Sequence, residues 1–410
     1  MDMAKDQKDF FKGKHPWSAT KDDLLSCYLT PFFTKTYGYS RNGIVYVDAF
    51  AGEGLFDDGS AGSPVIAMRK LLTAAKKQRT KIPVQFIFAE ANQDARQRLE
   101  AASARTKGNV NYIRRPIILE SFEKAVNAAR AATIRIGCTP STYFFYIDPF
   151  GVKDLRMDLL LGSPNPQHTE VLLNFNTIGF IRDACAALKS ALTVPDDVEV
   201  LNDSLGSNLS TNERIERLTS CVGSGEWIDV IRSKQGGDAD FWEVEYQIAQ
   251  LFCKNAASGY RYVTNMPIKD MEHGPYGKGL LKYRMVHMTN NADGCVLMND
   301  NMVKRNDLNQ TAQAGLFRVD VDGRDVEQGA IQEAMRQSVE SLPIGKYVKM
   351  GELAASVISQ CGVFARSTEL LKNHLKPFID SGQLEREIKL TRTGRLKNSF
   401  APHDRVRRTF

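Results

Sequence analysis

The sequence predicts an α/β protein whose main domain is built on a doubly wound, largely parallel sheet, with a smaller helical domain after it. Three observations indicate this class. Short runs of β-branched and aromatic residues alternate with stretches of helical periodicity over roughly the first 180 residues. Three of those runs end in an acid, and the first acid is followed by a turn with two glycines. From about residue 326 the chain returns to short helical patterns rich in basic residues.

The first strand and its turn are the most informative stretch of the chain. Residues Ile44 to Asp48 form an apolar run that ends in an acid, and Gly52 and Gly54 follow one residue apart. Glycine adopts positive φ without a steric penalty, so this pair predicts a tight turn. At the carboxyl end of a sheet strand, such a turn lets a ligand approach the backbone and the N-terminus of the next helix. An ordinary strand and turn is the alternative, because one G-x-G pattern is weak evidence by itself.

Two later strands add acids at equivalent places. The run from Val84 ends at Glu90, whose carboxylate is expected to accept hydrogen bonds from a ribose diol, and the run from Thr142 ends at Asp148. Because the carboxyl ends of parallel strands meet at one edge of a sheet, we expect the three acids to form one site. The alternative is that these acids serve only as turn formers or helix N-caps.

Hydrophobic periodicity and the positions of turn-forming residues predict the remaining elements of the main domain. An amphipathic helix over 17–38, interrupted near Pro31, precedes the first strand. Further helices are predicted at 64–77, 94–104, 121–135, 211–221 and 241–256, and further strands at 110–113, 171–176, 260–266 and 282–288. The last two strands are expected to form an antiparallel pair. The helical stretch from about 181 to 258 is predicted to be an insertion between strands of the sheet.

The C-terminal segment is predicted to be a second domain, so that the domains span 1–325 and 326–410. Helices at 349–360 and 367–380, a strand from Leu384 and a basic wing near 391–395 resemble a winged helix-turn-helix. From Glu340 onward there are 13 Lys and Arg against 7 Asp and Glu, a net charge of +6 that equals that of the whole chain. We therefore expect DNA or RNA to be bound here by these residues: Arg366, Lys372, Lys376, Arg392, Arg395 and Lys397. A protein-docking module is the alternative.

Composition excludes several classes of protein. The chain has 410 residues, of which 42% are hydrophobic and 25% charged, as in an ordinary soluble globular protein. Its apolar runs are shorter than the roughly 18 residues that span a bilayer, and its start has no signal-peptide core, so we expect no membrane contact and a cytoplasmic location. The seven cysteines are scattered without a C-x-x-C pair, which argues against a disulfide framework and against a zinc site.

The strand-end motifs resemble those of a known family. The stretch from Val47 to Gly54, Glu90, and the stretch from Ile147 to Gly151 are similar to the motifs of class I S-adenosylmethionine (SAM) dependent methyltransferases. More narrowly, the chain resembles the three-Cys-motif partner proteins, on these further stretches: Trp17 to Lys21, Gly62 to Pro64, and Leu172 to Phe175. The resemblance implies a Rossmann-like class I methyltransferase fold. It also implies that SAM is held by Asp48, Ala49, Phe50, Gly52, Gly54 and Glu90.

The same resemblance places the chemistry at Asp148, Pro149 and Phe150. In methyltransferases that act on exocyclic amines of bases, a related Asp/Asn-Pro-Pro-aromatic motif accepts hydrogen bonds from the amine and stacks a ring on the base. Here the carboxylate of Asp148 and the carbonyl of Pro149 are expected to be the acceptors, and Phe150 the stacking ring, so that catalysis is mainly positioning. The chain departs from the motif, because Phe150 stands where the second proline belongs and Gly151 where the aromatic belongs.

Together these inferences predict a SAM-dependent methyltransferase that acts on an exocyclic amine of a nucleic-acid base, with the winged helix aiding substrate binding. Two alternatives stay open. One is an inactive or partner-dependent nucleic-acid-binding accessory subunit of a modification or defence system, with a three-Cys-motif protein as its partner. The other is a small-molecule methyltransferase whose winged helix dimerises. The departures at Phe150 and Gly151 make the first alternative credible.

Overall fold

The structure is a computed structural model. It describes residues 16–39, 43–136, 141–190, 192, 209–233, 238–270, 280–309, 322, 324, 326–388 and 400–410. The chain divides into two compact units, one formed by Met1–Tyr260 with Pro267–Met288 and one formed by Arg261–Met266 with Thr289–Phe410. None of the helices in the described ranges is long and apolar enough to cross a membrane.

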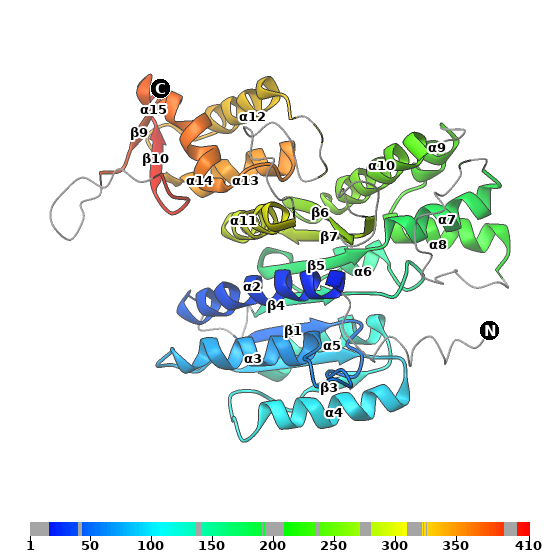
Figure 1. Ribbon diagram of the computed structural model, residues 1–410. Coiled ribbons are helices and arrows are strands. Elements are labelled where there is room, and N and C mark those ends of the chain that lie inside the picture. Colours follow the sequence, from blue (N-terminus) through cyan, green and yellow to red (C-terminus); the bar gives the residue numbers. More distant parts are fainter. Residues whose placement is uncertain are drawn as a thin grey trace. The chain divides into compact units, whose positions relative to one another are not determined.

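A seven-stranded sheet organises the main body of the fold (Figure 1). Its strands, in order of sequence, are β1 (Ile44–Asp48), β2 (Val84–Ala89), β3 (Ile117–Leu119), β4 (Thr142–Ile147), β5 (Thr169–Phe175), β6 (Tyr262–Asp270) and β7 (Leu280–Thr289). In space their order is β3-β2-β1-β4-β5-β7-β6, and the pairs among the first five strands of that order are parallel. The order reverses between β1 and β4, which is the topological switch point of a doubly wound sheet. The doubly wound, Rossmann-like sheet predicted from the sequence is therefore confirmed.

The last two strands complete the sheet as neighbours. Residues 271–279 join β6 to β7, and this connection is shorter than the dozen or so residues that a parallel crossover needs. The two strands consequently run antiparallel, as the sequence predicted. Their apolar side chains continue the core, with Met266, Met285 and Met288 all buried.

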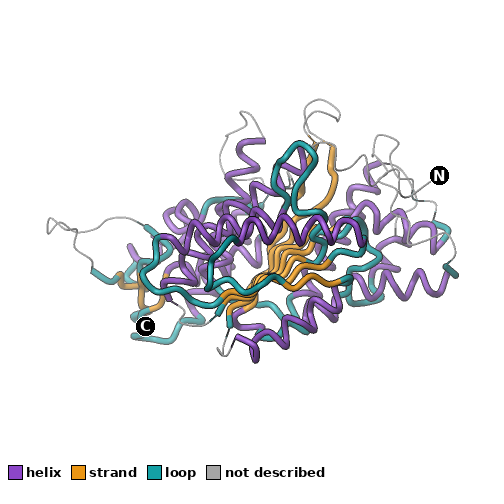
Figure 2. The backbone as a smooth tube through the Cα atoms, turned by 90° about the horizontal axis from the view of Figure 1, so that it is seen from below, coloured by secondary structure: helices purple, strands orange, loops and turns teal. Residues whose placement is uncertain are grey.

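Helices cover both faces of this sheet, which Figure 2 shows as a layer of strands between helical layers. They are α2 (Pro16–Tyr39), α3 (Ser63–Lys76), α4 (Gln93–Lys107), α5 (Phe122–Ile136), α6 (Met157–Leu161), α7 (Thr177–Leu188), α8 (Thr211–Val222), α9 (Trp227–Arg232) and α10 (Asp238–Ala256). Helix α2 packs on α3 and α3 on α4, whereas α5 packs on β1 and β2. Helices α8, α9 and α10 lie between β5 and β6 in sequence, where the helical insertion was predicted.

Helix α2 continues through Pro31, so the predicted interruption there is wrong. An internal proline removes one i to i−4 hydrogen bond and costs about 3 kcal/mol. Packing of the same helix on the sheet offsets that cost. The rings of Tyr28 and Phe32 lie 5.8 and 5.1 Å from the ring of Phe144 in β4, and Phe33 is fully buried.

The strand predicted at 110–113 is also wrong. Ile113 makes only an isolated bridge to Val84, and the third strand of the sheet begins after Pro116. Proline has no N–H and interrupts a ladder, so pairing with β2 resumes only at Ile117. Ile113 is buried, which explains the apolar signal at that position.

A buried ion pair ties α10 to β7. The guanidinium of Arg284 donates to both carboxylate oxygens of Glu245, at 2.7 and 2.6 Å, and each side chain is 3% exposed. The hydroxyl of Thr177 donates to the same carboxylate at 2.5 Å. Three elements from separate parts of the chain are thereby joined by one buried, hydrogen-bonded charge pair.

The second unit contains a helical cluster and a small sheet. Its elements are α11 (Ala292–Asn309), α12 (Gln328–Glu340), β8 (Val348–Lys349), α13 (Met350–Cys361), α14 (Ser367–Leu370), a π-helical turn η3 (Leu371–Leu375), α15 (Lys376–Asp380), β9 (Leu384–Arg386) and β10 (Arg405–Arg408). The sheet has the order β8-β10-β9 with antiparallel pairs. The helix predicted at 367–380 is thus three consecutive helical pieces, and the wing predicted near 391–395 lies outside the described residues.

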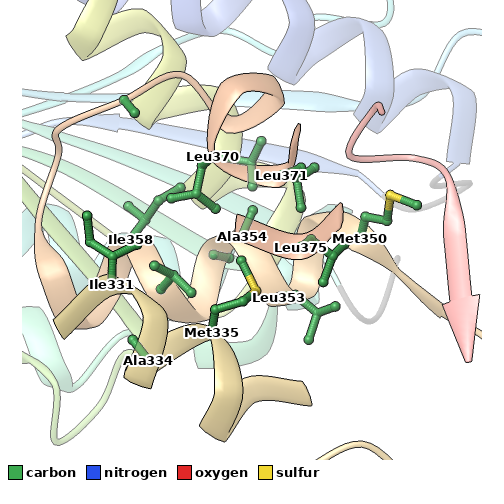
Figure 3. Close-up of a cluster of buried hydrophobic side chains, with 14 of the residues drawn as sticks. Ile331, Ala334, Met335, Met350, Leu353, Ala354, Ile358, Leu370, Leu371 and Leu375 are labelled. Atoms are coloured by element: carbon green, nitrogen blue, oxygen red, sulfur yellow. The ribbon is translucent and has the colours of Figure 1, made fainter. Parts of the chain in front are cut away.

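The core of this unit is made by helix faces of matching periodicity. Ile331 and Met335 of α12, Leu353 of α13, and Leu371 and Leu375 of η3 are all buried together (Figure 3). A polar contact fixes the start of α14, because the carboxylate of Asp300 accepts the backbone N–H of Ser367 at 2.7 Å and its hydroxyl at 2.6 Å.

Candidate functional site at the carboxyl edge of the sheet

Strand register brings the three predicted acids to the same edge of the sheet. Asp48 is paired with Phe88 on one side and with Tyr146 on the other. Glu90 and Asp148 therefore stand two residues beyond the partners of Asp48, on the strands that flank it. The sequence-based expectation that these acids lie together follows directly from the parallel pairing of β2, β1 and β4.

The turn after β1 has the conformation that its glycines permit. Gly52 has φ of 58° and Gly54 has φ of 79°, both in the left-handed region that favours glycine. A Cβ on Gly54 would lie 3.0 Å from Cδ1 of Leu99, so this position also allows α4 to pack closely. The carbonyl of Ala89 accepts the N–H of Ala51 at 2.8 Å, which holds the turn against the end of β2.

Glu90 braces this turn from the neighbouring strand. Its carboxylate accepts the backbone N–H of Gly52 at 3.0 Å and that of Asn92 at 2.8 Å. The side chain predicted to hold a ribose therefore also shapes the backbone that a ligand would approach. Because an ionised carboxylate offers about four lone-pair sites, two acceptor sites remain for hydroxyl donors.

Asp48 is fully buried, at 0% exposure. Its Oδ1 receives a long contact of 3.4 Å from the N–H of Phe50, and its Oδ2 has no hydrogen-bond partner among the described residues. Burial raises the pKa of Asp48 to about 7, against the lowering effect of the nearby Ser63 hydroxyl, and the carboxylates of Asp148 and Asp22 add to the rise. Near neutral pH the protonated and ionised forms of Asp48 are consequently both populated.

Asp148 sits in a charged cluster that joins α2 to the sheet. The ammonium of Lys21 donates to Oδ2 of Asp148, and the amide of Asn174 donates to Oδ1 at 2.7 Å. The ammonium also lies 5.7 Å from the ring centroid of Tyr283 in β7. Burial disfavours the charged lysine, but Asp148, Tyr283 and Asp22 together raise the pKa of Lys21 above its ordinary value. Lys21 is therefore a protonated partner that neutralises Asp148.

Sequence reasoning missed the role of Lys21 and of Tyr283. Lys21 is separated from Asp148 by 127 positions, and a lysine near the start of an amphipathic helix carries no signal of such a pair. Asn174 was recognisable, because it lies near the end of a predicted buried strand. A polar residue at the carboxyl end of a central strand is the pattern that marks it.

The remaining predicted site residues lie along the same edge. Ala49 donates its N–H to the carbonyl of Tyr146 at 2.9 Å, and the ring of Phe50 lies 6.2 Å from that of Phe122. Pro149 is buried, whereas Phe150 keeps 50% of its surface exposed. A large apolar side chain exposed immediately beyond Asp148 is placed to contact a ligand that reaches this edge.

Several buried polar atoms near these acids have no hydrogen-bond partner among the described residues. They are Oδ2 of Asp48, Oδ1 of Asn174 and the hydroxyl oxygens of Tyr46 and Tyr146. Buried polar atoms are normally satisfied, so a group of four on three adjacent strands needs an explanation such as ordered water or a ligand. Oδ1 of Asn174 can only accept, as can Oδ2 of Asp48 when it is ionised, which fits a ligand that brings donors or positive charge.

The basic residues predicted to bind nucleic acid belong to the second unit. Arg366, Lys372 and Lys376 are exposed on or just before the helical segment that starts at α14, and Lys376 pairs with Asp380 one turn later. The other three predicted residues, Arg392, Arg395 and Lys397, lie outside the described residues. Of the three described residues, Arg366 immediately precedes this helical segment, and Lys372 and Lys376 lie on it.

No protein-family model and no curated protein matches the chain. Among solved structures, Trm1 from Pyrococcus horikoshii in complex with S-adenosyl-L-methionine is 11% identical, with a TM-score of 0.34, over 97% of this chain and 92% of that one. The methyltransferase domain of the bacterial protein CtHen1-C is 11% identical, with a TM-score of 0.28, over 65% of this chain and 100% of that one. Likenesses this distant leave the function to be inferred from the chain's own residues.

Proposed function

We propose that this protein is a SAM-dependent methyltransferase of the class I type. The observation that carries the proposal is the convergence, at the switch point of the sheet, of the glycine turn after β1 with the carboxylates of Asp48, Glu90 and Asp148. Ligands of open α/β sheets bind beyond the carboxyl ends of the strands at this point. The buried acceptor atoms of Asp48 and Asn174 fit a ligand that carries positive charge and donors, as SAM does.

In this proposal, one group of residues binds the cofactor and another binds the methyl acceptor. The turn through Gly52 and Gly54 lets the cofactor lie against the backbone, and Glu90 offers acceptors to its hydroxyl groups. When bound, SAM supplies an electrophilic methyl group. Asp148, neutralised by Lys21 and oriented by Asn174, offers hydrogen-bond acceptance to an N–H of the substrate, while exposed Phe150 offers a stacking face. Catalysis of this kind depends on orientation more than on strong base chemistry.

A nucleic acid is the substrate class that we propose, with the second unit as a winged helix that aids its binding. Support comes from the order of the elements, since α12, β8, α13, the helical segment from α14 to α15, β9 and β10 follow one another with β10 between β8 and β9. The basic excess from Glu340 onward adds electrostatic support. The finer proposal, that the chain is a three-Cys-motif partner protein, rests on the motifs quoted above.

One observation favours a second candidate, a partner-dependent accessory subunit. Both carboxylate oxygens of Asp148 already accept hydrogen bonds, from Lys21 and Asn174. A substrate amine must therefore share the carboxylate with these donors. In the accessory role the partner supplies the chemistry, and the chain binds nucleic acid without turnover by itself.

Calorimetric titration of SAM into the full chain tests the proposed cofactor. We expect micromolar binding in the wild type and at least tenfold weaker binding in Gly52→Val, because a branched side chain at φ of 58° disrupts the turn and blocks close approach to the backbone. Gly59→Val is the matched control, since Gly59 also has positive φ, at 81°, but a Cβ there has nothing within 4 Å. Absence of SAM binding by the folded wild type contradicts the methyltransferase proposal.

Salt-dependent binding of duplex DNA and RNA tests the role of the second unit. Each phosphate contact contributes about 0.9 to the slope of log K against log salt for a DNA duplex. The double variant Lys372→Ala/Lys376→Ala is therefore expected to lose affinity severalfold at low salt and to lower the slope by about 2. Arg336→Ala is the control, because it removes an exposed positive charge of α12 that is outside the predicted set of contacts. An unchanged slope in the double variant removes these lysines from the interface.

A further inference from the structure

A groove of about 540 Å³ opens on the second unit, away from the sheet edge described above. Its walls come from α12, from η3 and α15, from the residue before β9, and from β10 and the residues that follow it (Figure 1). All of the residues that line it belong to this one unit. Its volume lies within the range of about 300–1,000 Å³ that is usual for ligand pockets.

The charged side chains of the groove balance one another. The guanidinium of Arg336 donates to Glu333 at 2.8 and 2.6 Å and to Glu340 at 2.7 and 2.6 Å. The guanidinium of Arg408 donates to main-chain oxygens of two further residues. His374 adds no charge at neutral pH, because burial lowers the pKa of its imidazole. Two arginines are thus matched by two glutamates, and the groove carries no net charge.

The groups that remain available to a ligand are amides and apolar rings. The side chains of Gln332, Asn373 and Gln383 line the groove and make no hydrogen bond within the described ranges of the chain. Each amide offers both donors and an acceptor. Phe410 is 65% exposed, and Phe378 lies partly buried against the core of the unit. A matching occupant brings an apolar side chain together with neutral donors and acceptors.

This combination favours a polypeptide over a nucleic acid. A nucleic-acid strand carries a phosphate with each base, and phosphates are bound by cations that replace their counter-ions. Both arginines of the groove already donate to protein oxygens, and the carboxylates of Glu333 and Glu340 repel phosphates. A peptide brings neutral N–H and C=O groups that match the amides, and the centres of protein interfaces are rich in aromatic residues.

We propose that this groove binds an uncharged peptide segment of a partner protein, with an aromatic or leucine-sized side chain of that segment packed against Phe378 and Phe410. The amide side chains of the groove hydrogen-bond to the main chain of the segment. Lys372 and Lys376, the described lysines assigned above to nucleic acid, are not among the residues that line the groove. The inference therefore goes beyond the proposed function and does not depend on it.

Panning a phage-displayed library of short random peptides against the full chain tests the proposal. We expect the enriched peptides to be uncharged, to carry an aromatic or leucine side chain, and to bind with micromolar affinity in fluorescence-anisotropy titrations. Phe410→Ala is expected to weaken binding about tenfold and Asn373→Ala about threefold, because they remove an apolar contact and a hydrogen-bonding group. Ile344→Ala is the matched control, since Ile344 is in the same unit, is also 65% exposed and does not line the groove.

The outcomes decide between the possible occupants. Peptide binding that weakens in Phe410→Ala and Asn373→Ala but not in Ile344→Ala supports the inference. Absence of enriched peptides, or equal binding by all the variants, overturns it. Displacement of the peptides by a single-stranded oligouridylate assigns the groove to nucleobases, and self-association that Phe410→Ala abolishes in sedimentation assigns it to a second copy of the chain. Either of these two results also overturns the inference.

Folding of the variants is checked by circular dichroism. Asn373 is exposed, so Asn373→Ala decides the matter if Phe410→Ala is not folded. SAM binding is measured separately, and its presence or absence leaves the result for the groove unchanged.

Discussion

Replacing Glu245 by alanine is expected to lower the free energy of unfolding by about 3–5 kcal/mol, the largest single-residue effect that we predict for this protein. The change leaves the guanidinium of Arg284 buried at 3% exposure without its carboxylate, and it also removes the acceptor of the Thr177 hydroxyl. An unpaired buried charge is far more costly than the ion pair itself is stabilising. Equilibrium denaturation in urea, followed by circular dichroism, measures the loss.

The matched control is an exposed ion pair that also involves α10. Lys254 of α10 pairs with Glu226, but these side chains are 67% and 55% exposed. Glu226→Ala is therefore expected to cost less than about 1 kcal/mol. Equal losses of unfolding free energy in the two variants would show that burial does not determine how much the Arg284–Glu245 pair contributes to stability.

Replacing Lys21 by methionine is expected to cost about 2–4 kcal/mol of stability. Methionine has a similar length but no charge, so Asp148 keeps Asn174 as a donor and loses its cation. We expect less than for Glu245→Ala, because the side chain of Asp148 is 19% exposed and water can reach it. Thermal or urea denaturation at neutral pH measures this loss.

A double variant separates the charge from the packing. Lys21→Met/Asp148→Asn removes both charges and keeps the shapes of both side chains, so it is expected to recover more than half of the lost stability. Arg115→Met, which breaks the exposed Arg115–Glu100 pair, should change stability by no more than about 0.5 kcal/mol. A double variant no more stable than Lys21→Met would indicate that the lysine stem acts by packing alone.

The sequence alone determined the sheet and most of its edge. Strands β1, β2, β4, β5, β6 and β7 were predicted within a few residues, because each is an apolar run bounded by turn residues. The positions of Asp48, Glu90 and Asp148 followed from the same runs, since parallel strands bring their carboxyl ends to one edge. The prediction of a strand at 110–113 was wrong. Ile113 is a single buried apolar residue, and Pro116 prevents regular pairing with β2 before Ile117.

Only the tertiary structure decided how these groups behave. The pairing of Lys21 with Asp148 joins residues 127 positions apart, and the pairing of Glu245 with Arg284 joins a helix to a strand of the sheet. The pKa of Asp48 depends on how completely α2 and the neighbouring strands exclude water from it. Periodicity along a chain reports which side of an element is buried, but burial of a given polar atom and the charge opposite it arise from elements that meet only in the folded protein.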